Sequence, residues 1–246
     1  MKNDRIFDGI ADTFSKNIYG TTKGRLRHAI LCDVLAPFVA KPLKAIDVGG
    51  GTGVMAAHLA SQGHDVVLTD ASKDVLQQAE ENLKLLEGVT IRHQYLQEIN
   101  DLNHFDLVLC HAVLEWLDAP FDAITHLFNN MRNGATLSLS FFNQDANLFA
   151  NAIYGNFDYI AKGLKAKKQV RLNPKQPLSA IKVVGFCESL GFKVKAKAGI
   201  RCFHDYMRDI SHQDSKYEEL LSLERQYCMS EPYMWLGKYF HIVLEK

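Results

Sequence analysis

Two patterns of apolar residues alternate along this chain. Short apolar runs predict buried strands, and apolar residues recurring every three or four positions predict amphipathic helices. Strands are predicted at residues 43–48, 64–70, 89–93, 105–111, 135–143, 192–198 and 235–244. Helices are predicted at residues 26–35, 54–60, 72–86, 181–190 and 217–227, with one more ending near residue 131. This regular alternation is typical of an α/β fold with a mostly parallel sheet.

A glycine-rich turn joins the first predicted strand to the helix after it. Asp47 is followed by Gly49, Gly51 and Gly53 at alternating positions, with Gly50 between the first two. Glycine suits such a turn because the backbone bends tightly and a ligand must approach it closely. The dinucleotide fingerprint G-x-G-x-x-G is not matched, since its third glycine is absent. An acid followed by alternating glycines instead resembles the first motif of the class I S-adenosylmethionine-dependent methyltransferases.

A second acid, Asp70, ends the next predicted strand. It stands about 20 residues after the glycine turn, where a carboxylate can accept hydrogen bonds from both hydroxyls of a ribose. His111 ends the fourth predicted strand, and ligands of such folds bind outside the carboxyl ends of the strands. His111 is therefore a candidate for the pocket wall, and a hydrogen-bonded structural histidine is the alternative.

Composition narrows the class of protein. Hydrophobic residues make up 47% of the 246, and 28 basic residues balance 28 acidic ones, so overall charge argues neither for nor against nucleic acid. The amino terminus lacks the apolar core of a signal peptide, and no apolar run approaches the roughly 20 residues that span a bilayer.

The 5 cysteines are scattered and form no C-x-x-C pair, which favours reduced thiols in a cytoplasmic protein. The 10 histidines show no metal-ligand spacing, so no metal is expected.

One segment does not fit the repeating pattern of strand and helix. Residues 144–180 contain aromatic residues followed by a basic cluster. Aromatic faces can stack on unpaired bases and cations can neutralise phosphates, so this segment is a candidate RNA-binding surface, with a solvated basic insertion as the alternative. The residues proposed for it are Tyr154, Phe157, Tyr159, Lys165, Lys167, Lys168 and Arg171.

These features predict a single domain over residues 1–246. It would comprise an N-terminal helical cap (1–42), a cofactor-binding half (43–143), the basic and aromatic insertion (144–180) and the C-terminal half of the sheet (181–246). The resemblance to class I methyltransferases implies an α/β, doubly wound, Rossmann-like class I methyltransferase fold. It also implies that the mostly parallel seven-stranded sheet ends in an antiparallel hairpin.

Four further stretches resemble one family in particular. They are residues 14–24 (FSKNIYGTTKG), 111–116 (HAVLEW), 155–159 (GNFDY) and 203–206 (FHDY), and together they resemble the bacterial tRNA 5-carboxymethoxyuridine methyltransferases over essentially the whole chain. The resemblance implies methylation of the carboxylate of 5-carboxymethoxyuridine, at the wobble position in the anticodon loop of tRNA, with S-adenosyl-L-methionine as cofactor. It implies cofactor contacts at Arg27, Asp47, Gly49, Gly50, Gly51, Gly53, Asp70, Ala71, Gln97 and His111.

The implied chemistry suits the residues present. A carboxylate has a reference pKa near 4 and is ionised at neutral pH, so it needs no general base. Cationic or hydrogen-bonding groups should instead hold it in place, and the candidates are Tyr19, Lys23, Arg201 and Tyr206. Two alternatives stay open: a small-molecule O- or C-methyltransferase, and a non-catalytic tRNA-binding module that retains a cofactor pocket. The oligomeric state is left open.

Overall fold

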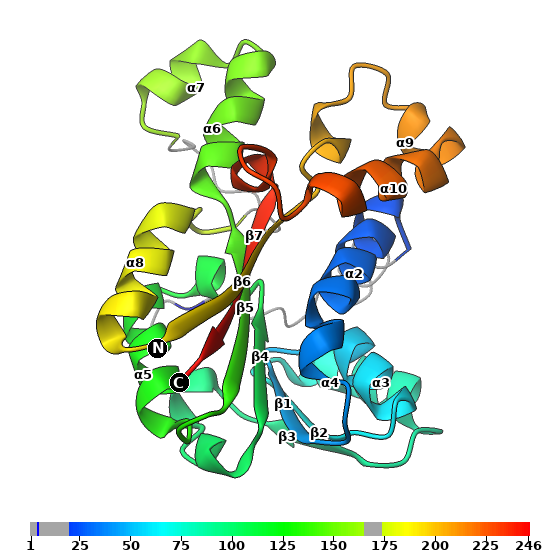
Figure 1. The fold of residues 1–246 in the computed structure, drawn as a ribbon, viewed down its shortest axis with the longest axis vertical. Helices are drawn as coiled ribbons and strands as arrows, with labels where there is room; N and C mark the ends of the chain where they lie inside the picture. The colour runs from blue at the N-terminus through cyan, green and yellow to red at the C-terminus, as the bar shows by residue number, and fades with distance from the viewer. Residues whose placement is uncertain (1–3, 5–19, 165–173) are drawn as a thin grey trace.

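The computed structural model describes residues 4, 20–164 and 174–246. At its centre lies one seven-stranded sheet with the strand order β3-β2-β1-β4-β5-β7-β6 (Figure 1). The strands are β1 (Lys44–Val48), β2 (Asp65–Asp70), β3 (Val89–His93), β4 (Leu107–His111), β5 (Thr136–Phe142), β6 (Lys193–Ile200) and β7 (Tyr239–Glu245). β7 runs antiparallel to both of its neighbours, and the other pairings are parallel. The predicted fold class, including the terminal antiparallel hairpin, is confirmed.

Helices cover both faces of this sheet. The longer ones are α2 (Thr22–Leu35), α3 (Val54–Ser61), α4 (Lys73–Leu83), α5 (Pro120–Asn130), α6 (Gln144–Ile153), α8 (Ala180–Leu190) and α10 (Tyr217–Tyr227). The short helices α7 (Phe157–Ala161) and α9 (His212–Ser215) lie near the upper end of the molecule in Figure 1. α5 and α8 pack on one face, and α2, α3 and α4 pack on the other (Figure 1). Among the described residues, no helix combines the length and apolar character required to span a membrane.

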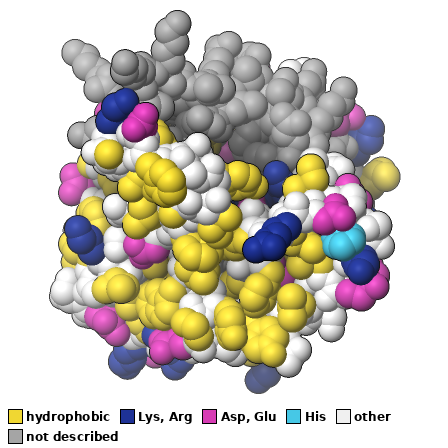
Figure 2. Space-filling view, turned by 90° about the horizontal axis from the view of Figure 1, so that it is seen from above, with side chains coloured by type: hydrophobic (Ala, Val, Ile, Leu, Met, Phe, Trp, Pro, Cys, Tyr) yellow, Lys and Arg dark blue, Asp and Glu magenta, His cyan; other side chains and the backbone are white. Residues whose placement is uncertain are grey.

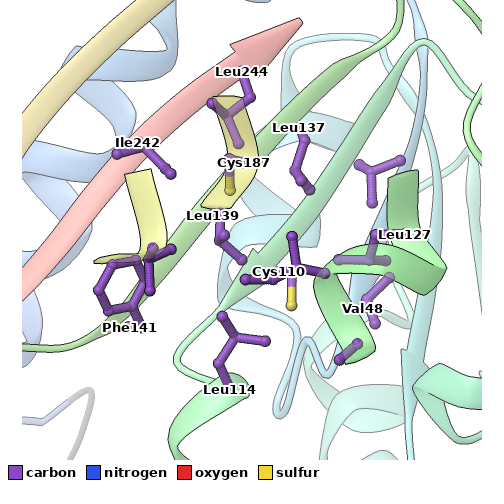
Figure 3. Close-up of a cluster of buried hydrophobic side chains, with 14 of the residues drawn as sticks. Val48, Cys110, Leu114, Leu127, Leu137, Leu139, Phe141, Cys187, Ile242 and Leu244 are labelled. Carbon is purple, nitrogen blue, oxygen red and sulfur yellow. The ribbon is translucent and has the colours of Figure 1, made fainter. Parts of the chain in front are cut away.

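Each face of the sheet buries its own hydrophobic cluster. On one face, leucines of β5 and β7 interdigitate with Leu127 of α5 and Cys187 of α8 (Figure 3). On the other face, Leu26 and Ile30 of α2 and Leu59 of α3 are fully buried against the sheet. Burying a leucine or isoleucine side chain stabilises a fold by about 1.5–3 kcal/mol. Because both faces are covered, the central strands are apolar on both sides, which is why they appear as continuous apolar runs in the sequence.

Local capping explains where several helices begin and end. Ser72 caps α4, since its hydroxyl accepts a hydrogen bond from the N–H of Val75. Thr21 caps α2 in the same way through the N–H of Gly24. α8 ends at Gly191, which adopts φ 108°, a left-handed conformation that favours glycine.

α4 ends at Leu83, three residues before its predicted end.

The buried face of α10 includes an acidic residue. Leu223 is 39% exposed, whereas the neighbouring Glu224 is buried. Glu224 can be buried because its carboxylate accepts hydrogen bonds from the N–H groups of residues 202, 203 and 204.

The last strand also begins later than predicted. Trp235 lies in a short 3₁₀ turn, Tyr233–Leu236, and β7 starts at Tyr239. Gly237 separates the two and approaches the backbone of Gly199 so closely that an added Cβ would stand 2.5 Å from the Cα of Gly199. Trp235 instead stacks on Phe240, with ring centroids 5.1 Å apart. Trp235 therefore extends the apolar run in the sequence because it packs beside the strand, although it is not part of it.

Candidate active site

A cleft opens at the carboxyl ends of β1 and β4, where the order of the strands reverses. This switch point is the usual ligand site of an open α/β sheet. The cleft is lined by Asp4, Arg27, Val48, Gly49, Gly51, Asp70, Ala71, Val75, Gln94, Tyr95, Leu96, Gln97, His111, Ala112, Val113, Trp116 and Leu117. Seven of the ten residues predicted to contact the cofactor are in this set: Arg27, Gly49, Gly51, Asp70, Ala71, Gln97 and His111.

The glycine turn forms the floor of the cleft. Gly49 and Gly51 adopt φ 67° and 60°, a region that L side chains rarely occupy. A Cβ on Gly49 would also stand 2.5 Å from a methyl group of Val113, so the turn has no room for a side chain. Gly53 has φ 85° and forms the N-cap of α3 behind the cleft wall. The turn therefore leaves its backbone open to a ligand.

Asp70 holds this turn in place from the end of β2. One carboxylate oxygen accepts a hydrogen bond from the N–H of Gly51 at 3.1 Å, and the other accepts from the N–H of Ser72 at 2.9 Å. Each carboxylate oxygen has a second lone pair, so the group can accept further hydrogen bonds from a ligand. Its position in the cleft wall fits the ribose contact expected from the sequence.

Asp47 lies beneath the turn and is not part of the cleft wall. Its side chain is buried, and a Cβ on Gly50 would stand 2.6 Å from its carboxylate. Burial, and then the nearby charge of Asp70, raise the pKa of Asp47 to about 7. Asp47, Gly50 and Gly53 are thus not in the lining of the cleft, and their direct contacts with the cofactor stay a prediction.

A different set of groups lines the far end of the cleft. The side-chain amide of Gln97 donates a hydrogen bond to Asp4 at 3.1 Å, and Asp4 also accepts from the N–H of Asp118 at 2.8 Å. Tyr95 and Ala71 complete this end. Sequence reasoning missed Asp4, since an isolated acid near the amino terminus belongs to no motif and reaches the cleft only through the tertiary fold.

His111 is both a cleft residue and part of a buried hydrogen-bond chain. Its Nε2 lies 2.7 Å from the hydroxyl of Ser138, which lies 2.8 Å from Nε2 of His241. Burial lowers the pKa of His111 well below its ordinary value and that of His241 to about 3, so both imidazoles are neutral. His111 thus lines the cleft and is also hydrogen-bonded, while its contact with the cofactor stays a prediction. Its partners come from other strands and carry no signal in the sequence.

The cation of Arg27 enters the cleft from α2. Its guanidinium lies 4.9 Å from the ring centroid of Tyr239, and that of Arg201 lies 5.5 Å from the same ring. Arg27, Tyr239 and Arg201 thus connect the cleft to the end of β6.

Glu115 is fully buried, and among the described residues no side chain forms an ion pair with it. Burial raises the pKa of Glu115 to about 7, although the charge of Arg27 acts in the opposite direction.

The groups expected to hold the acceptor carboxylate differ in their exposure and in their present partners. Tyr19 lies outside the described residues, and Lys23 is exposed on the first turn of α2. Arg201 already forms an ion pair with Asp205, with Nε 2.8 Å from the carboxylate. The hydroxyl of Tyr206 donates a hydrogen bond to the carbonyl of Leu236 at 2.7 Å. Tyr206 therefore links the turn His204–Tyr206 to the turn Tyr233–Leu236.

Lys238 is a cation at this end of the sheet that sequence reasoning missed. It is half-buried, and burial lowers its pKa, as do the nearby charges of Arg201 and Lys23. Two of these cations, Arg201 and Lys238, act on one carboxylate, that of Asp205. Burial by itself would raise the pKa of Asp205, but Arg201 and His204 lower it to about 2, so it is ionised.

The candidate RNA-binding segment is only partly described. Tyr154 and Phe157 are 67% and 68% exposed, and Tyr159 is half-buried. Apolar side chains of α6 are exposed beside them, and hydrophobic side chains are spread over this end of the molecule (Figure 2). Lys165, Lys167, Lys168 and Arg171 lie outside the described residues.

Comparison with known proteins gives a consistent result. Residues 46–137 match a family model described as a methyltransferase domain. The chain is 41% identical to the tRNA 5-carboxymethoxyuridine methyltransferase of Escherichia coli K12, over 99% of this chain and 97% of that protein. It is 30% identical to a ubiquinone biosynthesis O-methyltransferase of Methylococcus capsulatus, over 46% of this chain and 48% of that protein.

Solved structures share the fold at low sequence identity. Magnesium protoporphyrin IX methyltransferase from Synechocystis with bound SAH superposes with a TM-score of 0.60 at 20% identity, covering 79% of this chain and 89% of that one. The same enzyme with bound SAM gives a TM-score of 0.59 at 16% identity, covering 97% and 91%.

Proposed function

This chain belongs to the family of the tRNA 5-carboxymethoxyuridine methyltransferases, and we propose that it methylates the carboxylate of 5-carboxymethoxyuridine in the anticodon loop of tRNA. The observation that carries this proposal is 41% identity over 99% of the chain, which includes the cleft and the cation-rich end of β6. The cofactor is S-adenosylmethionine. We further propose a single domain that works in the cytoplasm.

The chemical groups that line the cleft suit this cofactor. Asp70 offers a carboxylate for the ribose hydroxyls, and the backbone of Gly49 and Gly51 is open to a close approach. Gln97 and Tyr95 would border the adenine, and His111 would border the methionine end as a neutral imidazole. When bound, S-adenosylmethionine supplies a methyl group activated on a sulfonium centre.

The protein supplies position and charge to the acceptor. The acceptor carboxylate is the nucleophile and is already ionised, so no side chain must remove a proton. Lys23 and Lys238 are the cations best placed to hold it, because Arg201 is already paired with Asp205. Holding a group in position can supply a large part of a rate enhancement.

The exposed face of α6 and α7 is the proposed contact for the anticodon loop. Tyr154 and Phe157 present aromatic rings to solvent, and base stacking on such rings contributes about 1–3 kcal/mol per base. Lys165, Lys167, Lys168 and Arg171 follow in the sequence and would contact phosphates.

The function is tested by methyl transfer from labelled S-adenosylmethionine. Two acceptors are compared, tRNA that carries 5-carboxymethoxyuridine and the same tRNA without the modification. We expect label on the first alone, released by mild base as expected for an ester. Label on neither tRNA, with cofactor binding intact, would contradict the proposal and favour a small-molecule methyltransferase.

The RNA contact needs a separate test. Reversing the charges of Lys167 and Lys168 to Glu should weaken tRNA binding and flatten the dependence of the binding constant on salt, because fewer counterions are released. Lys41→Glu/Lys44→Glu, at the amino end of β1, is the matched control, since both residues are exposed. An equal effect of both double variants would contradict a directed RNA-binding surface.

A further inference from the structure

Three potential metal ligands converge between α2 and α3, away from the cleft wall. His28 and Cys32 lie one turn apart on α2, and His58 comes from α3. One ligand atom from each residue lies within 4.8 Å of the other two. All three side chains are partly exposed, so an ion can reach them from solvent. The spacing of the histidines in the sequence indicated no metal, because His58 joins the pair only in the folded chain.

The ligand atoms are close enough to share one ion once the ring of His28 turns. The thiol sulfur of Cys32 lies 3.6 Å from Nε2 and 3.8 Å from Nδ1 of His28, so it faces the ring between the two nitrogens. A rotation of this partly exposed ring would direct one nitrogen lone pair to an ion bound by the sulfur, in place of the present contact. The rings of His28 and His58 meet edge-on, with centroids 5.5 Å apart. Two ligands at positions i and i+4 of one helix are a common part of zinc sites.

Metal binding at this site would be coupled to the loss of a proton. Cysteine binds metals as the thiolate, so the thiol of Cys32 must release its proton when an ion binds. Nε2 of His58 lies 3.3 Å from the side-chain nitrogen of Gln62, and an ion bound to this nitrogen would replace that contact.

We propose that His28, Cys32 and His58 form a binding site for a thiophilic divalent cation such as Zn²⁺, which joins α2 to α3. On binding, a bond forms between the metal and the sulfur of Cys32, and the thiol proton passes to the buffer. The imidazoles donate one nitrogen each, and water completes the tetrahedron. The mixed nitrogen and sulfur ligands favour Zn²⁺ over Mg²⁺ or Ca²⁺, which prefer oxygen.

The site would link two helices that shape the cofactor cleft. Arg27, which lines the cleft, directly precedes His28 on α2. α3 begins immediately after Gly53 of the glycine turn. A cation held between them would therefore stabilise the native packing of both walls and raise the melting temperature, because it binds only the folded chain.

The test uses tag-free protein titrated with Co²⁺, whose thiolate complexes show a charge-transfer band in the near ultraviolet. We expect one equivalent of Co²⁺ to produce this band and an excess of Zn²⁺ to abolish it. Cys32→Ser should remove the band, and His58→Gln should weaken binding at least tenfold. His104→Gln, which changes an exposed histidine elsewhere, is the matched control.

Three results would overturn the proposal. The first is the absence of a thiolate band in wild-type protein. The second is unchanged Co²⁺ affinity in His58→Gln, which would mean that α3 contributes no ligand. The third is an equal rise in melting temperature with Zn²⁺ in wild-type protein and in the triple variant His28→Gln/Cys32→Ser/His58→Gln. Binding of S-adenosylmethionine by each variant shows that it has folded, and the outcome is independent of which acceptor the enzyme methylates.

Discussion

The carboxylate of Asp70 accepts a hydrogen bond from the N–H of Gly51 at 3.1 Å, which joins the end of β2 to the glycine turn after β1. The same side chain accepts from the N–H of Ser72, so it fixes the turn and the start of α4 together. The two sequence features that indicated a cofactor site are thus in direct contact. Because of this contact, we expect one carboxylate to control both the shape of the cleft and its affinity for the cofactor.

Replacing Asp70 should therefore weaken cofactor binding. We expect Asp70→Ala to lower the affinity for S-adenosylmethionine by about 1–3 kcal/mol, through the loss of a charged hydrogen bond. Titration calorimetry measures this directly. Asp65→Asn is the control, because Asp65 is exposed at the opposite end of β2. Wild-type affinity in Asp70→Ala would show that Asp70 does not bind the ribose.

Glu115 should make stability fall as pH rises. Its pKa is about 7 in the folded protein, against an ordinary value of 4.5. Below pH 4.5 both states are protonated and the group costs nothing. As pH rises from 4.5 to 7 the unfolded chain ionises first, so the cost grows to the order of 3 kcal/mol. Glu115→Gln should thus gain stability relative to wild type between pH 5 and pH 8, measured by urea denaturation.

The pH dependence is the test for Glu115, because any cost of burying the amide is the same at both pH values. Glu87→Gln serves as the comparison, since Glu87 is exposed. If the difference between Glu115→Gln and wild type were equal at pH 5 and pH 8, Glu115 would not be a raised-pKa group.

His241 should act in the opposite direction. Burial lowers its pKa from 6.5 to about 3, so the folded protein keeps it neutral while the unfolded chain gains a proton below pH 6.5. The resulting loss of stability is absent above pH 7 and reaches about 2 kcal/mol at pH 5. His241→Gln should lose less stability than wild type on going from pH 7.5 to pH 5. The exposed His104→Gln should follow the wild-type profile, and identical profiles for all three proteins would refute this assignment.

Two glycines with the same backbone angle separate strain from crowding. Gly53 and Gly63 have φ 85° and 84°, but only at Gly53 would a Cβ meet a side chain, 2.7 Å from a methyl group of Leu83. Gly63→Ala should cost about 1–2 kcal/mol from the left-handed backbone alone. Gly53→Ala should cost more, because Leu83 must also move. Urea denaturation of both variants measures the difference, and equal losses would show that Leu83 relaxes without penalty.

The order of the strands along the chain and the position of the cleft could be predicted from the sequence. Each depends on short-range patterns: apolar runs for β1 and β4, the glycines after Asp47 for the tight turn, and an acid at the end of β2 for the ribose. Local patterns of this kind have a direct physical cause in backbone geometry and burial. The family resemblance added the acceptor, which no local pattern specifies.

Tertiary structure decided which side chains meet. The hydrogen-bond chain from His111 through Ser138 to His241 joins three strands, and His58 joins His28 and Cys32 across two helices. Asp47 shows the converse, because a residue of the recognised motif lies beneath the turn and not in the cleft wall. Contacts between residues far apart in the chain depend on strand order, register and helix packing, and periodicity within one element contains no information about them.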